Sequence, residues 1–130
     1  MTTLDAARDL FAGTQIAHLA TVLPDGAPHS VPVMIDVEGG YLVFFTSPGS
    51  RKARNLERDD RVAISVADRD DLVRCAVVRG RVVKRVGGDA GWELVDRIFG
   101  KYTGGGRYPR GEEREAFLVE PTHVIVPTFG

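Results

Sequence analysis

The chain has 130 residues and a formal net charge of −1, so it lacks the excess of cations that a general nucleic-acid-binding surface usually carries. This length suits a single domain, residues 1–130, that buries a core without a disulfide or a structural metal, and the lone cysteine, Cys75, cannot form an internal disulfide. Because the sequence shows no signal-peptide pattern at its start and no run approaching ~20 apolar residues, we expect a soluble, cytoplasmic protein that does not span a membrane.

The first predicted elements are a short helix and a buried strand. Apolar residues recur at helical spacing over residues 3–12, which predicts a helix that covers one end of the core. The segment 16–23 is apolar on both faces, as expected for a strand buried on both sides. Residues 24–26 read Pro-Asp-Gly, a turn in which Gly26 supplies the positive φ.

A proline interrupts the next predicted strand, residues 30–37. The apolar side chains of this segment share one face: Val31, Val33, Ile35 and Val37. Pro32 has no N–H for a strand ladder, so the strand is predicted to be an edge there, to be bulged, or to face a ligand. A turn at 38–40 leads into a third strand, 41–46, and the three strands are predicted to form a meander.

The second half of the chain continues the β pattern. A helix over 51–59 is predicted, followed by a strand at 62–67, a polar loop at 68–71 and a long strand at 72–86. Gly80 in that strand predicts a bend or bulge, of the kind that lets a sheet curl into a small antiparallel barrel.

A further helix and one or two strands complete the chain. Trp92, Val95, Ile98 and Phe99 share a helical face within residues 88–104. The glycine-rich stretch 103–113 predicts a mobile loop whose Arg107, Tyr108 and Arg110 close over a pocket, or else a solvated connector. Residues 116–126 predict a last strand or two, with Pro121 at an edge or a break.

The charges of the 51–60 segment run in the wrong order for an isolated helix. Cations occupy the first turn, where the helix dipole favours anions, and Glu57, Asp59 and Asp60 occupy the other end. A phosphate at the helix start, held by free backbone N–H groups, the Ser50 hydroxyl and two or three cations, would make the arrangement favourable. The alternative is a solvated surface helix, since each misplaced exposed charge costs only ~0.3–1 kcal/mol. The cations are Arg51, Lys52 and Arg54.

Several common catalytic and metal-binding patterns are missing. The sequence has neither a G-x-G-x-x-G nor a Walker motif, and His18, His29 and His123 lie in three separate segments without the spacing of zinc ligands. A triad of Ser30, His29 and Asp36 is disfavoured because adjacent residues of a strand point to opposite faces. We therefore expect no metal site and chemistry that comes from a bound cofactor.

Three stretches of the chain carry a family resemblance: LATVLPDGAPHSVPVMID, FFTSPGSRKARNLERDDRV and VVRGRV. They resemble the split β-barrel flavin-binding superfamily of pyridoxamine 5′-phosphate oxidase, which includes the actinobacterial oxidoreductases that use the deazaflavin coenzyme F-420. The resemblance covers about residues 15–86. It implies a mainly β (α+β) fold, an antiparallel split β-barrel with peripheral short helices.

The resemblance also implies where a cofactor binds. Arg51 and Lys52 would hold the phosphate, Ser30 to Ile35 would run along the ring system and ribityl chain, and Arg54 and Asn55 are candidates for a longer cofactor tail. Ser30 stands where the oxidase has a phosphate-binding arginine, and Cys75 stands where it has a glutamine near the ring. The complete predicted set is Ser30, Val31, Pro32, Val33, Phe45, Thr46, Ser50, Arg51, Lys52, Asn55 and Cys75.

These two departures, and a C-terminal segment without the arginines and histidine of the oxidase, make pyridoxamine phosphate oxidation unexpected. The pattern is closer to the deazaflavin-dependent group, with FMN as the alternative cofactor. The implied reaction is hydride transfer between the cofactor and a small conjugated substrate, in a homodimer with the cofactor at the subunit interface. We assign no catalytic side chain, and Tyr108 is the only candidate proton donor, with a simple surface aromatic as the alternative.

Two other functions are compatible with the same residues. A cofactor carrier or sensor would need binding without turnover, which the sequence does not distinguish from catalysis. A small barrel whose Arg51, Lys52 and Arg54 bind an anion such as RNA, together with Tyr41 and Phe45, is the other alternative. The near-neutral net charge disfavours it, and we expect no nucleic-acid partner.

Overall fold

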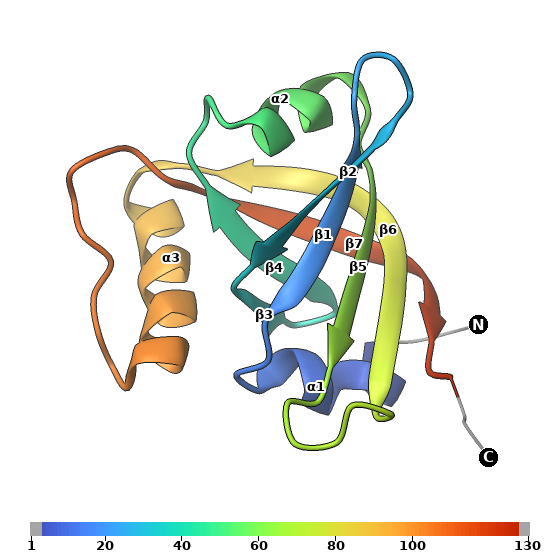
Figure 1. Cartoon of the computed structure of the whole chain (residues 1–130). Coiled ribbons are helices and arrows are strands. Elements are labelled where there is room, and N and C mark those ends of the chain that lie inside the picture. The colour runs from blue at the N-terminus through green and yellow to red at the C-terminus, as the bar shows by residue number, and fades with distance from the viewer. Residues whose placement is uncertain (1–3, 128–130) are drawn as a thin grey trace.

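A computed structural model describes residues 4–127 as a curled antiparallel sheet with short helices around it (Figure 1). Its strands are β1 (Ala17–Val22), β2 (Pro28–Val33), β3 (Ile35–Glu38), β4 (Tyr41–Thr46), β5 (Arg61–Ala67), β6 (Cys75–Val86) and β7 (Glu115–Ile125). Its helices are the 3-10 turn η1 (Leu4–Ala7), α1 (Arg8–Ala12), α2 (Arg51–Arg58) and α3 (Gly88–Thr103). The predicted split-barrel fold class is confirmed, and most predicted elements lie within a few residues of their expected bounds.

The two edges of the sheet are consecutive in the chain. The strand order is β2-β1-β5-β6-β7-β4-β3, and only Met34 separates β2 from β3. Two peptide steps span at most ~7 Å, so the sheet must curl until its two edges lie close together. The predicted single strand 30–37 and the three-stranded meander are therefore wrong, because β2 pairs with β1 whereas β3 pairs with β4. The alternation of faces continues across the break, which is why the sequence pattern did not reveal it.

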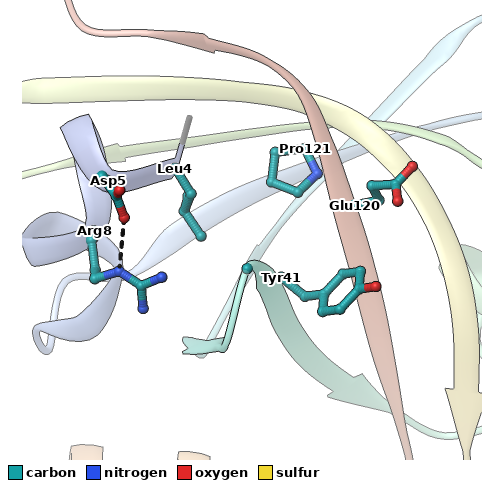
Figure 2. Close-up of a pocket in the computed structure, with 7 residues that line it drawn as sticks. Leu4, Asp5, Arg8, Tyr41, Glu120 and Pro121 are labelled. Carbon is teal, nitrogen blue, oxygen red and sulfur yellow. Dashed lines mark ion pairs between the residues drawn. The ribbon is translucent and has the colours of Figure 1, made fainter. Parts of the chain in front are cut away.

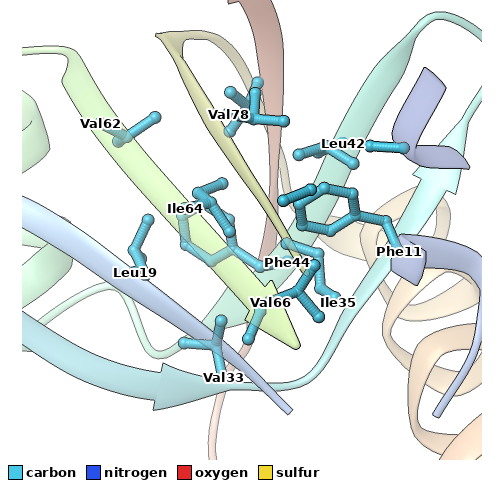
Figure 3. Packing of buried hydrophobic residues seen from close by; sticks show 14 of the residues in the cluster. Phe11, Leu19, Val33, Ile35, Leu42, Phe44, Val62, Ile64, Val66 and Val78 are labelled. Atoms are coloured by element: carbon cyan, nitrogen blue, oxygen red, sulfur yellow. The ribbon is translucent and has the colours of Figure 1, made fainter. Parts of the chain in front are cut away.

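One hydrophobic core fills the inside of the curl (Figure 3). Phe44 and Phe117 stack at its centre with ring centroids 5.2 Å apart. Phe11 of α1 closes one end of the barrel, and Leu56 of α2 packs at the other. The predicted burial of the first strand on both faces is wrong: β1 alternates, and His18 is exposed on its outward face.

Gly80 forms the predicted bulge. The pairing of β6 with β7 shifts register between Arg79 and Gly80, and a Cβ at Gly80 would lie 2.2 Å from the Glu120 carbonyl oxygen. Only glycine permits this close approach of two backbones. Pro121, opposite Gly80, lies beyond the end of the pairing with β4, so its missing N–H interrupts no bond to that strand.

Side chains of α3 bond to the backbone of β3 at the edge of the split. Arg97 donates to the Val37 carbonyl at 3.2 Å, and Lys101 donates to the Ile35 carbonyl. The Tyr102 hydroxyl accepts from the Ile35 N–H at 3.2 Å. These bonds supply partners for an edge that β2 does not cover. Burial of this region lowers the pKa of Lys101 and raises the pKa of Tyr102.

Candidate cofactor site

The turn between β4 and α2 is organised by two hydroxyl groups. The Thr46 hydroxyl donates to the Ser50 Oγ at 3.0 Å, and the same Oγ accepts from the Ala53 N–H at 3.2 Å. Ser50 is thus the N-cap of α2. Because Arg51 and Lys52 occupy the first two helical positions, their backbone N–H groups have no partner within the helix and point out of its start.

The cations at this helix start have no acidic partner. Arg51, Lys52 and Arg54 form no ion pair within 4.0 Å among residues 4–127, although most other cations of the described chain do. Arg51 and Arg54 are exposed and Lys52 is half-buried. Burial lowers the pKa of Lys52, and the positive charge of Arg114 lowers it further. The site therefore holds positive charge that an anion would stabilise.

Acidic residues at the other end of α2 are all paired. Glu57 bonds to Arg85 at 3.2 Å and Asp60 to Arg81 at 2.7 Å. Asp59 accepts two bonds from the Arg61 guanidinium, at 2.9 and 2.7 Å, which lowers the pKa of Asp59 to about 2. The inverted charge order is neutralised here by strands β5 and β6.

Asn55 fixes α2 on the barrel. Its side chain is fully buried, and its amide donates to the Thr21 hydroxyl of β1 at 3.0 Å. Arg58, one turn later, donates to the Val22 carbonyl. Asn55 therefore anchors the buried face of α2 to β1. The predicted contact with a cofactor tail would need an exposed side chain. Arg54 offers one.

Strand β2 presents alternate residues to the outside. Ser30 and Pro32 are exposed, while Val31 and Val33 pack against the core. Ser30 lies opposite Ala20 of β1, which lines a groove of about 380 Å³ on the outward face. β2 contains two prolines four residues apart, and a strand edge with prolines is disfavoured for pairing with a further strand. Pro28 is the second proline.

Cys75 lies away from the other predicted residues of its own chain. It opens β6 and pairs with Ala67, at the end of the β5–β6 hairpin opposite to α2. Cys75 and Pro32 both lie on the outward face of the sheet. Three inter-strand spacings separate β6 from β2, which is roughly 14 Å at the usual distance between strands. The structure thus brings Phe45, Thr46 and Ser50 together with the cations of α2 and does not bring Cys75 to them.

The loop after α3 contacts the end of β4 beside the candidate site. The sequence predicted a loop that closes over a pocket, but not the contacts that it makes. Tyr108 lies edge-on to Phe45, with ring centroids 5.1 Å apart, so it is a packed aromatic and not a free surface side chain. Arg114 follows in the same loop, next to Glu115, which pairs with Thr46 at the end of β4. Only the register between β4 and β7 places Arg114 there, and no local sequence signal encodes that register.

A hollow elsewhere on the molecule contains none of the predicted cofactor residues. Figure 2 shows this space of about 420 Å³ beside η1 and β7, where Arg8 pairs with Asp5 at 3.5 Å and Tyr41 and Pro121 line the wall. Among residues 4–127, no three His, Cys, Asp or Glu side chains gather closely enough to hold a metal ion. No helix of the described chain is long and apolar enough to cross a bilayer.

Solved structures of similar proteins share this fold. An F420 reductase is 30% identical, with a TM-score of 0.82, and the match covers 91% of this chain and 94% of that one. A protein of unknown function from Agrobacterium tumefaciens is 25% identical with a TM-score of 0.78, and the match covers 95% of this chain but 55% of that one. A pyridoxamine 5′-phosphate oxidase-like protein from Listeria innocua, at 15% identity, 94% and 95% coverage and a TM-score of 0.72, shows the fold alone.

Among curated proteins, none matches this sequence. The family-level resemblance is nevertheless confirmed over nearly the whole chain, well beyond the segment that carried it in the sequence. Residues 3–126 match the family model described as pyridoxamine 5′-phosphate oxidase, and the chain therefore belongs to that family.

Proposed function

We propose that this protein is an oxidoreductase that binds the deazaflavin coenzyme F-420 and transfers hydride to a small conjugated substrate. The observation that carries the proposal is the capped start of α2, where Arg51 and Lys52 have no acidic partner among residues 4–127. Two free N–H groups, a partly buried hydroxyl pair and unpaired cations are the donor set that a phosphate ester requires. The 30% identity to an F420 reductase supports the deazaflavin over FMN, which is the alternative.

Different residues on the outside of the barrel would bind the phosphate and the ring system of the cofactor. Arg51, Lys52 and the backbone at Ser50 would hold the phosphate, and the outward edge of β2 at Ser30 and Pro32 would lie along the ring system. A reduced deazaflavin held there would supply hydride chemistry, and solvent would supply the proton that completes reduction of the substrate. The protein's part is to orient the ring and to shield it from water.

We also propose that a second copy of the chain covers the outward face beside this site. The helices lie at the two ends of the barrel and on its β4 side, so no helix of residues 4–127 covers the outward face of β2, β1 and β5 (Figure 1). Its central side chains are small, with Ala20, Ala63 and Ser65 half-buried in the single chain, while His18 and Arg61 are exposed on the same face. This face is continuous with Ser30 and Pro32, so the partner would close the cofactor site.

The dimer is tested by placing a charge on that face. Ala63→Arg is expected to give a monomer in light scattering and to weaken cofactor binding, because burying an unpaired guanidinium at the centre of the interface is costly. Val83→Arg, at an exposed position outside this face, is the matched control. A dimer that survives Ala63→Arg with unchanged affinity would contradict the assignment.

The cofactor and reaction are tested by direct titration. We expect the purified protein to bind F-420 more tightly than FMN, and the reduced complex to be oxidised when quinones or enones are added. Tight FMN binding with weak F-420 binding would select the alternative cofactor. Binding of either cofactor without oxidation by any acceptor would instead identify a carrier or sensor.

Arg54 offers a second test of cofactor identity. Its side chain is exposed one turn into α2, next to the proposed phosphate position. If the bound cofactor carries a longer anionic tail, Arg54→Ala should weaken F-420 binding and leave FMN binding unchanged. Equal effects on both cofactors would show that Arg54 does not bind a cofactor tail.

A further inference from the structure

The described chain brings a distant arginine to the start of α2. Thr46, the last residue of β4, pairs with Glu115, the first residue of β7. Arg114 therefore enters the sheet beside the turn that Ser50 caps, although it is far from this turn in sequence. Its side chain is only 19% exposed, so it is held against the protein.

An aromatic contact holds this arginine in place. The Tyr108 ring packs edge-on between Phe45 and Phe99, with centroids 5.1 Å from each. The Arg114 guanidinium lies over the same Tyr108 ring, 5.3 Å from its centroid. Tyr108 thus connects the end of β4 to Arg114, in the geometry of a cation–π contact.

A second set of contacts anchors the loop to α3. Arg110 bonds to Asp96 at 2.6 Å and lies 3.9 Å from the centroid of the Trp92 ring. The Tyr108 N–H also donates to the Asp96 carboxylate at 3.1 Å. The predicted mobile loop is therefore attached at several points, and its path to the site is fixed by side chains of α3.

The charge of Arg114 is poorly balanced within the chain. Its only carboxylate partner among residues 4–127 is Glu112, at 3.4 Å, and that side chain is 78% exposed. Glu115, the nearer carboxylate along the strand, bonds to Arg85. Lys52 has no acidic partner in the described chain and experiences the positive charge of Arg114. Two neighbouring, partly buried cations repel one another unless an anion lies between them.

We propose that Arg114 is a further phosphate-binding cation of the cofactor site, and that Tyr108 is the residue that positions it. The inference rests on the proposed cofactor function and extends it to the loop after α3. An arginine can hold two phosphate oxygens at once, whereas Lys52 acts as a single point charge. Arg51 and Lys52 would approach the phosphate from the helix start, and Arg114 would approach it from the β7 side of the turn.

The test compares ligands with and without the phosphate. Arg114→Gln should weaken F-420 binding about 10-fold to 100-fold, the loss of one charge-assisted hydrogen-bonding group. It should not change the affinity for the same deazaflavin lacking the phosphate. Arg107→Gln is the control, because it removes the same charge from the same loop at a side chain that is 74% exposed and faces Asp96. Unchanged F-420 affinity, or equal losses for both ligands, would overturn the assignment.

Tyr108 is tested by two substitutions. Tyr108→Phe keeps the ring and should preserve F-420 affinity, whereas Tyr108→Ala releases Arg114 and should weaken binding of the phosphate-bearing ligand selectively. Loss of affinity for the phosphate-free ligand as well would show a general packing role and would overturn the positioning role.

Failure of the proposed function gives a different result. If the wild-type protein binds neither F-420 nor FMN, the cofactor proposal fails, and inorganic phosphate becomes the probe. NMR shifts of the Ser50 to Ala53 amides on adding phosphate should then occur in wild type and be weaker in Arg114→Gln. Equal shifts in both proteins would overturn the role of Arg114.

Discussion

The two ends of α2 both carry charges that oppose the helix dipole, but the structure compensates only one of them. At the C-terminal end, Glu57, Asp59 and Asp60 each bond to an arginine of β5 or β6. At the N-terminal end, Arg51 and Lys52 have no acidic partner among residues 4–127. The unfavourable charges at the C-terminal end are therefore balanced by arginines of the protein, whereas those at the N-terminal end need a bound anion to balance them.

The comparison predicts that substitutions at the two ends act on different properties. Partnered charges contribute to folding, and their loss should be visible in unfolding experiments and not in cofactor binding. Unpartnered cations contribute little to folding and can even oppose it, so their loss should be visible mainly in binding.

The largest effect is expected from removing both first-turn cations. Arg51→Ala with Lys52→Ala should weaken binding of the phosphate-bearing cofactor by ~2–4 kcal/mol, because charge-assisted bonds to phosphate contribute ~1.5–3 kcal/mol each and neighbouring groups on one ligand are less than additive. Thermal unfolding of the free protein should be nearly unchanged. Isothermal titration and circular dichroism measure the two quantities. An unaltered dissociation constant would show that the phosphate does not bind at this helix start.

The helix cap should affect both folding and binding. Ser50→Ala removes the bond to the Ala53 N–H and the acceptor of the Thr46 hydroxyl, so stability should fall by ~1 kcal/mol. Cofactor affinity should also fall, since the helix start loses its fixed geometry. Denaturant unfolding measures the first effect. Ser47→Ala is a suitable control, because Ser47 contributes only its backbone carbonyl to this turn, and an equal loss there would contradict the capping role.

Sequence reasoning located the helix and its unusual charges because both are local features. It also found the Gly80 bulge and the Gly26 turn, where backbone geometry restricts the residue type. It missed the break at Met34, since the alternation of faces continues through that residue while the pairing partner changes from β1 to β4. It missed the position of Arg114 for the same reason: strand register depends on contacts between distant segments.

The partnered end of α2 should respond in the opposite way to the cation pair. Glu57→Gln breaks an exposed pair with Arg85, and such pairs contribute ~0–1 kcal/mol, so a small loss of stability is expected without any change in cofactor affinity. Arg85 keeps its second partner, Glu115, at 3.3 Å, which limits the loss. A binding defect as large as that of the double cation variant would remove the distinction between the two ends.

The smallest effect concerns the proton equilibrium of Asp59. Bonds from Arg61 lower the pKa of this carboxyl from 3.8 to about 2 in the folded protein. A depressed carboxyl pKa stabilises the fold above the unfolded value, and this contribution disappears as the pH falls from about 4 towards 2. Arg61→Gln should therefore raise the pKa of Asp59 towards its ordinary value, as followed by NMR titration of the carboxyl carbon.

Because the pair is exposed, we expect little change in stability at neutral pH and none in cofactor affinity. A pKa that stays near 2 in Arg61→Gln would mean that Arg61 does not balance Asp59, and the contrast between the two ends of α2 would then rest on Glu57 and Asp60 alone.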